Sequence, residues 1–120
     1  MRYAGAAKVQ IMVKKACRLV LLRHGQSQWN LENRFTGWKN VPLTKKGETE
    51  AQKAGELIKK HKINIDRVFS SILERANRTA EIAIKHAELN NLLEDNKLLM
   101  TRSEKLNERD YGDLVGLNKE

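Results

Sequence analysis

The residues with the clearest chemical potential are Arg23, His24 and Gly25, which directly follow an apolar run from Leu19 to Leu22. A neutral imidazole is a good nucleophile towards phosphorus near neutral pH, since its unperturbed pKa is about 6.5. A neighbouring guanidinium neutralises phosphoryl oxygens with forked donors, and a glycine lets the backbone approach a phosphate closely. By themselves, these three residues also fit a histidine packed at a strand end beside a surface arginine.

The elements that must position these residues alternate between strands and helices. The segment from Cys17 to Arg23, with its continuous apolar run from Leu19 to Leu22, has the length of a buried central strand of a parallel sheet. Thr44 is a candidate N-cap for the helix that follows. Further along, the pattern predicts helices over 44–61 and 73–87, strands over 63–69 and 97–101, and loops over 26–43, 88–96 and 110–120. This alternation predicts an α/β fold with a parallel sheet, whose ligands bind beyond the carboxyl ends of the strands.

Composition narrows the class of protein. The chain has 120 residues, which is the size of one domain, and 40% of them are hydrophobic. Its single cysteine, Cys17, excludes a disulfide framework, and no apolar run approaches the length of a membrane span. The basic N-terminus lacks the apolar stretch of a secretory signal. We therefore expect a soluble, cytoplasmic protein.

The net charge of +8 favours a polyanionic partner, either a nucleic acid or a small phosphorylated molecule. Residues 1–15 hold four basic residues and no acidic one, so about half of the excess lies there. We interpret residues 1–16 as an N-terminal extension of a domain over 17–120, with Met12 as a candidate start that would leave 1–11 untranslated. The rest mixes both signs and has few aromatics, which disfavours nucleic-acid binding.

The segment from Leu19 to Asn30 resembles the signature of the histidine phosphatase superfamily, and more narrowly that of the cofactor-dependent (2,3-bisphosphoglycerate-dependent) phosphoglycerate mutases. Three later segments agree in order with the mutases, namely residues 33–38, 42–57 and 106–119. The resemblance implies a three-layer α/β/α fold with a mostly parallel sheet. It also implies an isomerase of glycolysis and gluconeogenesis that interconverts 2-phosphoglycerate and 3-phosphoglycerate through a phosphohistidine.

The resemblance further implies a role for each matching residue. His24 would be the nucleophile, primed by 2,3-bisphosphoglycerate without a metal, and Glu108 the general acid/base. Arg23 and Arg75 would clamp the phosphoryl group. Substrate-binding residues would be Arg23, Ser27, Asn30, Thr36, Gly37, Arg75, Glu108, Arg109, Tyr111 and Lys119. The implied small-molecule partners are phosphorylated three-carbon acids. No nucleic acid or membrane is implied as a partner. The implied protein partner is either a second copy of the chain or a complementing C-terminal fragment.

The sequence also departs from the mutase pattern. Gln28 and Arg78 stand where the mutases usually have Glu and Gln, and the stretch between Arg75 and Glu108 is several residues longer than usual. Members of the family are about twice this length and carry a second active-site histidine in their later half. We therefore expect an incomplete domain with little or no mutase turnover on its own. A broad-specificity histidine phosphatase and a non-catalytic fragment of a split or decayed mutase gene remain alternatives.

Overall fold

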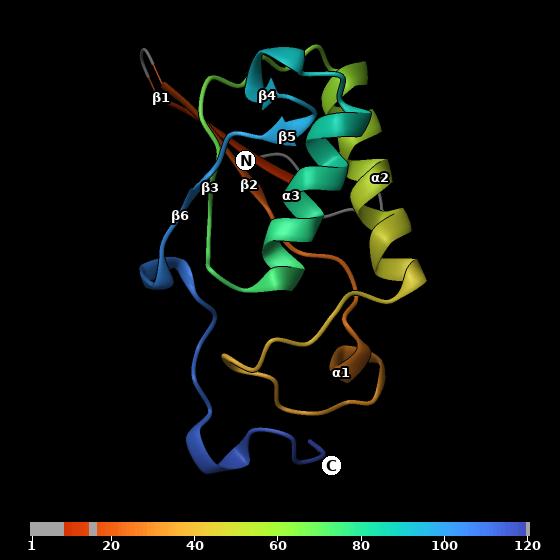
Figure 1. Ribbon diagram of the computed structural model, residues 1–120, viewed down its shortest axis with the longest axis vertical. Coiled ribbons are helices and arrows are strands. Elements are labelled where there is room, and N and C mark those ends of the chain that lie inside the picture. The colour runs from red at the N-terminus through yellow and green to blue at the C-terminus, as the bar shows by residue number, and fades with distance from the viewer. Residues whose placement is uncertain (1–8, 15–16, 120) are drawn as a thin grey trace.

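A computed structural model describes residues 9–14 and 17–119, and all structural statements below concern these residues. The helices and strands are β1 (Val9–Lys14), β2 (Cys17–Leu22), α1 (Gln28–Leu31), α2 (Lys45–Lys60), β3 (Phe69–Ser70), α3 (Glu74–His86), β4 (Leu93–Glu94), β5 (Lys97–Leu98) and β6 (Thr101–Arg102) (Figure 1). Short 3₁₀ helices cover Asn90–Leu92, Glu104–Leu106 and Gly112–Leu114. The predicted α/β class is confirmed. No helix among the described residues is both long and apolar enough to cross a membrane.

The two long helices form where the sequence predicts them and lie side by side (Figure 1). α2 begins after Thr44, whose hydroxyl accepts a hydrogen bond from the amide of Gly47 at 3.1 Å. This bond satisfies one of the unpaired amides of the first turn. The helices approach closely at Gly55, where a Cβ would overlap with the carbonyl oxygen of Ala83. The close approach of the two helices at that crossing therefore requires glycine.

β2 has a different partner from the one predicted. The sequence predicts β2 as a central strand of a parallel sheet. Instead it pairs antiparallel with β1, which lies within the predicted extension. An antiparallel neighbour close in sequence needs little loop-closure entropy, which favours this pairing. Val9 of β1 is only 2% exposed and packs with Ala54 and Ala83 of the helices, so part of the extension belongs to the core. Residues 1–8, 15 and 16 of the extension lie outside the described residues.

The helices cover one face of the β1–β2 pair. Val20 and Leu22 pack towards the core cluster, whereas Leu19 and Leu21 are 52% and 44% exposed. This alternation follows from the two-residue period of a strand, which sends successive side chains to opposite faces. The sequence suggests that β2 is buried on both faces. Among the described residues, only one of its faces is covered.

The predicted strand over 63–69 is wrong for most of its length. Only Phe69 and Ser70 are in β3, because Ile63 and Ile65 pack as a loop against Ile58 and Ala87. Their hydrophobicity therefore reflects burial beneath the helix ends.

The predicted strand over 97–101 is divided in two. β5 pairs antiparallel with β4 across Asp95 and Asn96, which have φ angles of 49° and 62°. Asn and Asp tolerate this left-handed region, which tight hairpins require. The chain then continues into β6, which pairs parallel with β3. The sequence predicts a loop over the Asn-rich segment 88–96. Part of this segment instead forms a 3₁₀ helix and the strand β4.

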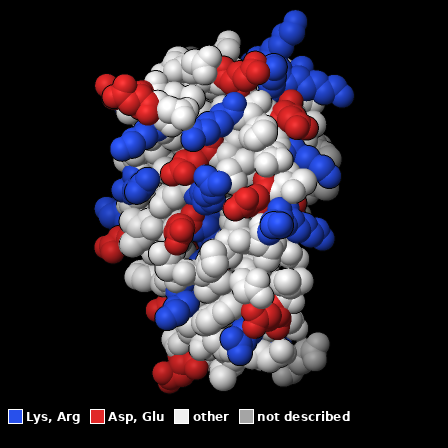
Figure 2. Space-filling view, turned by 45° about the vertical axis from the view of Figure 1, so that its right-hand side comes forward, with Lys and Arg blue, Asp and Glu red and all other residues white. Residues whose placement is uncertain are grey.

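Charged side chains of both signs are interspersed over the helices on the face shown in Figure 2. Lys59 and Glu88, for example, form an ion pair at 2.8 Å between α2 and the end of α3. This face does not carry the continuous basic stripe that nucleic-acid binding uses.

Candidate active site

The loop that follows β2 is fixed by side chains from both long helices. The amide of Gly25 donates to the Thr79 hydroxyl of α3 at 3.2 Å, and the amide of Gln26 donates to Glu50 Oε1 of α2 at 3.2 Å. The loop also lies directly on the start of α2, since a Cβ on Gly47 would overlap with the carbonyl oxygen of Gln26. The backbone around His24 is therefore anchored on two elements.

The ring of His24 is oriented by its own neighbour. Its Nδ1 lies 2.6 Å from the carbonyl oxygen of Gly25. Because a carbonyl oxygen can only accept, this nitrogen carries the proton and donates it. The other ring nitrogen, Nε2, faces Glu108 at 3.7 Å from Oε2, and whenever the imidazole is neutral it is the atom that carries the free lone pair. This tautomer is the one that a nucleophilic Nε2 requires.

Arg75 is the most deeply buried charged group near His24, with 1% of its side chain exposed. It lies in the first turn of α3. Its Nη1 donates to the carbonyl oxygen of Lys39 at 2.7 Å, and its Nη2 donates to the carbonyl oxygen of Gly37 at 2.6 Å and to Glu108 Oε2 at 2.8 Å. Burial of a charge is tolerable only with such partners. The guanidinium is therefore held rigidly by loop carbonyls and neutralised by Glu108.

Glu108 receives contacts from three segments. The pKa of its carboxyl is lowered from 4.5 to about 2, first by the hydrogen bond that Nε2 of His24 donates when both ring nitrogens carry a proton, and then by Arg75, against the opposing effect of burial. The His24 contact, at 3.7 Å, is longer than an ordinary hydrogen bond, so the 2.8 Å bond to Arg75 is the firmer of the two. The indole Nε1 of Trp38 donates to the Glu108 backbone carbonyl. Glu108 is therefore ionised near neutral pH.

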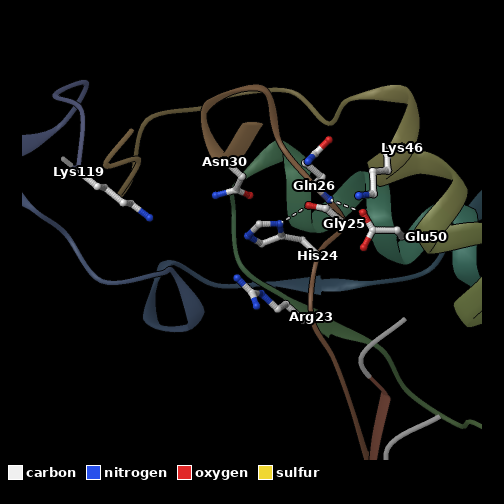
Figure 3. A pocket seen from close by; sticks show the side chains of 8 residues that line it. All are labelled: Arg23, His24, Gly25, Gln26, Asn30, Lys46, Glu50 and Lys119. Atoms are coloured by element: carbon white, nitrogen blue, oxygen red, sulfur yellow. Dashed lines mark hydrogen bonds between the residues drawn. The ribbon is translucent and has the colours of Figure 1, made fainter. Parts of the chain in front are cut away.

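A cavity of about 370 Å³ opens beside His24 (Figure 3). Three cationic side chains lie around it, those of Arg23, Lys46 and Lys119, together with the carboxylate of Glu50. The complete lining is Arg23, His24, Gly25, Gln26, Asn30, Lys46, Glu50 and Lys119. This excess of positive charge suits an anion bearing more than one charged group.

The structure brings together seven of the predicted site residues. Arg23, His24, Asn30 and Lys119 line the cavity, and Gly37, Arg75 and Glu108 are joined by hydrogen bonds next to His24. Arg75 and Glu108 are 33 positions apart in the sequence, and His24 and Glu108 are 84 apart. Only the folded chain creates this group.

The other four predicted binding residues belong neither to the cavity lining nor to the hydrogen-bonded group of Gly37, Arg75 and Glu108. The hydroxyl of Ser27 caps α1 by accepting from the amide of Asn30 at 3.2 Å. Thr36 donates to the carbonyl oxygen of Arg34 at 3.5 Å. The ring of Tyr111 packs on another aromatic ring and lies under the guanidinium of Arg109, 5.6 Å from the centroid. A direct role of these four residues in binding stays a prediction.

Sequence reasoning missed Gln26, Lys46, Glu50 and Thr79 as residues of this region. Lys46 and Glu50 are one helical turn apart at the start of α2, so a helical wheel places them on one face. The available signal was the pair Gly25 and Gly47, because a glycine within the first turn of a helix suggests that another backbone lies close to it.

The described part of the chain has no group of three or more His, Cys, Asp and Glu side chains that could hold a metal ion. The metal independence implied by the resemblance stays a prediction.

Comparisons with known proteins agree with this geometry. The family model of the histidine phosphatase superfamily (branch 1) matches residues 19–120. A 2,3-bisphosphoglycerate-dependent phosphoglycerate mutase of Caulobacter sp. (strain K31) is 54% identical over 101 residues, which cover 84% of this chain and 40% of that protein. The chain therefore spans about 40% of the length of this curated relative.

Solved structures of both mutases and phosphatases resemble the chain. The phosphoglycerate mutase of Bacillus anthracis str. Sterne superimposes with a TM-score of 0.69 at 32% identity, covering 79% of this chain and 38% of that one. A mycobacterial glucosyl-3-phosphoglycerate phosphatase superimposes with a TM-score of 0.66 at 29% identity, covering 81% and 41%. Proteins named as a mutase and as a phosphatase therefore both resemble this chain in fold.

Proposed function

Because the chain belongs to the histidine phosphatase superfamily, we propose that it transfers a phosphoryl group through His24, as part of a 2,3-bisphosphoglycerate-dependent phosphoglycerate mutase. The observation that carries this proposal is the meeting of His24, Arg75 and Glu108 beside one cationic cavity. The identity of 54% to a curated mutase supports the narrower activity, the interconversion of 2-phosphoglycerate and 3-phosphoglycerate.

The nucleophile of this reaction is Nε2 of His24. Its lone pair attacks phosphorus, the bond between phosphorus and the substrate oxygen breaks, and that oxygen leaves with the bonding electrons. The hydrogen bond from Nδ1 to the Gly25 carbonyl stabilises the positive charge that the ring gains. Arg23 and Arg75 offset the charge of the phosphoryl oxygens, which is the main task in this type of transfer.

Glu108 is proposed to move the proton of the substrate hydroxyl. It is ionised near neutral pH and can therefore accept a proton in the step in which a hydroxyl attacks phosphohistidine. For the opposite step it must first become protonated. An anion bound at Arg75 competes for that guanidinium and adds negative charge, and both effects raise the pKa of Glu108. The same carboxyl can thus act in both directions.

The cavity suits 2,3-bisphosphoglycerate, which carries two phosphates and a carboxylate. Arg23 and His24 would hold the phosphate that is transferred, while Lys46 and Lys119 lie on the lining where other anionic groups can bind. When bound, this cofactor supplies the phosphoryl group that primes His24. A place in glycolysis and gluconeogenesis and a cytoplasmic location belong to this proposal. A second copy or a complementing polypeptide as partner is also part of it.

A histidine phosphatase of broader specificity is the second candidate. The structural likeness to a glucosyl-3-phosphoglycerate phosphatase favours it. The two functions differ in the acceptor, which is a phosphoglycerate hydroxyl in the mutase and water in the phosphatase. A non-catalytic fragment is the third candidate, and it predicts no transfer to His24.

The test is to incubate the purified chain with 2,3-bisphosphoglycerate labelled with ³²P and to measure protein-bound label that is stable to alkali and lost in acid. We expect labelling in the wild type and none in His24→Asn. His61→Asn is the matched control, since His61 ends α2 and is exposed. Labelled chain is then mixed with 3-phosphoglycerate or with buffer alone.

The outcomes separate the three candidates. Label passed to phosphoglycerate supports the mutase, and label released only as inorganic phosphate supports the phosphatase. An unlabelled wild type, or a His24→Asn variant labelled as strongly as the wild type, would overturn the proposal. Because only the transfer to His24 and its discharge are measured, the test does not require steady-state turnover.

A further inference from the structure

The proposed catalytic side chains lie on separate elements that must be held at a fixed distance. His24 lies on the loop after β2, whereas Arg75 lies in the first turn of α3. The reaction requires phosphorus to contact both of them at once, and small displacements of such groups are costly in rate. Some contact must therefore connect the loop with the helix.

Thr79 makes this connection, one helical turn after Arg75. Its hydroxyl donates to the carbonyl oxygen of Arg75 at 2.7 Å and accepts from the amide of Gly25 at 3.2 Å. A hydroxyl has one donor and two acceptor positions, so both bonds form together. The residue is 2% exposed, so water does not compete for these bonds. One buried oxygen thus joins the backbone of Arg75 with the backbone next to His24.

The Gly25 peptide unit is well placed to transmit this constraint. Its amide nitrogen is bonded directly to the carbonyl carbon of His24, and its own carbonyl accepts from Nδ1 of the His24 ring. Fixing the Gly25 amide therefore fixes the peptide plane that joins Gly25 to the backbone of the nucleophile, while the next peptide, which supplies the Gly25 carbonyl, is held through Gln26 by Glu50.

We propose that Thr79 is a positioning residue whose hydroxyl sets the separation and orientation of His24 relative to Arg75. This inference rests on the proposed phosphoryl transfer through His24. Thr79 itself does not touch the phosphoryl group; it acts through the Gly25 peptide and the first turn of α3. A valine has the same shape without the hydroxyl, and a serine keeps the hydroxyl without the methyl group.

The experiment compares Thr79→Val and Thr79→Ser with a matched control, Thr49→Val. Thr49 makes the same hydroxyl bond within its helix, to the carbonyl oxygen of Lys45 at 3.1 Å, but it is exposed. We expect Thr79→Val to slow labelling of His24 by ³²P from 2,3-bisphosphoglycerate roughly tenfold, as one lost buried bond at a reacting group does. Thr79→Ser and Thr49→Val should stay within about twofold of the wild type on the same reasoning.

A second readout does not depend on phosphoryl transfer. The carboxyl of Glu108 titrates low because both His24 and Arg75 face it, so ¹³C NMR of this carboxyl reports their placement. Its pKa should rise towards 4.5 in Thr79→Val and stay low in Thr79→Ser. General destabilisation would not move the pKa within the folded fraction. If the wild type takes no label while this NMR shift is seen, the proposed function fails and the positioning role stands.

Equal labelling and an equal Glu108 pKa in Thr79→Val and the wild type would overturn the inference, as would a Thr79→Ser variant as impaired as Thr79→Val. If Thr79→Val does not fold, hydrogen exchange of the Gly25 amide in the wild type decides the question. Slow exchange supports the buried bond to Thr79, and exchange at the rate of a free loop contradicts it.

Discussion

Replacing Glu108 with glutamine removes the charge that neutralises Arg75 but keeps the size of the side chain. The pKa of Glu108 falls from 4.5 to about 2 on folding, and a full conversion at about 1.36 kcal/mol per pKa unit gives roughly 3 kcal/mol. Since 37% of the side chain is exposed, screening by solvent reduces this to about 1–2 kcal/mol. We expect Glu108→Gln to lower the free energy of unfolding by this amount at pH 7.

The pH dependence has a definite sign. Because folding lowers this pKa, the unfolded chain binds more protons than the native chain between about pH 2 and 4.5. The carboxylate therefore stabilises the fold fully above about pH 4.5, and this contribution disappears as the pH falls towards 2. The difference between the wild type and Glu108→Gln should thus be largest at neutral pH and fall to less than half at about pH 3.

Urea unfolding followed by circular dichroism between pH 3 and pH 7 measures this difference. Glu104→Gln is the matched control, since Glu104 is an exposed glutamate in the same segment. An independent measurement is the ¹³C NMR titration of the Glu108 carboxyl. A midpoint near 4.5, or a difference between the variants that does not change with pH, would refute the assignment of Glu108 as the partner of the buried guanidinium.

Three further predictions concern the surroundings of the site. In Gly47→Ala, the new Cβ overlaps with the Gln26 carbonyl, so the loop must shift. Both the free energy of unfolding in urea and the affinity for orthovanadate should fall. Unchanged values of both would contradict the close contact. A chain that starts at Met12 loses Val9, whose full burial is worth about 1.5–3 kcal/mol, so its thermal midpoint should fall below that of the longer chain. Thr44→Ala removes the N-cap of α2 and should cost about 1 kcal/mol in urea unfolding, with a loss below a few tenths arguing against the cap.

The two long helices could be predicted because their signals are local. The N-cap at Thr44 and the spacing of small and apolar residues on one face lie within a few turns of each other, and the observed bounds of α2 and α3 follow them closely. The strands were harder, because their pairing depends on partners elsewhere in the chain. The hydrophobicity of Ile63 and Ile65 predicts a strand. In the structure both side chains are instead packed under the helix ends as part of a loop, which explains the same hydrophobic pattern.

For the candidate site, the sequence by itself determined the chemical types, because a nucleophilic imidazole, a guanidinium and a carboxyl are properties of single residues in recognisable segments. His24, Arg75 and Glu108 could be named in that way. Only the tertiary structure decided that Arg75 is held by the carbonyls of a distant loop, that Glu108 pairs with it, and that Thr79 joins the helix of Arg75 to the His24 loop. These features arise from distances between segments far apart in the chain, which no local pattern specifies.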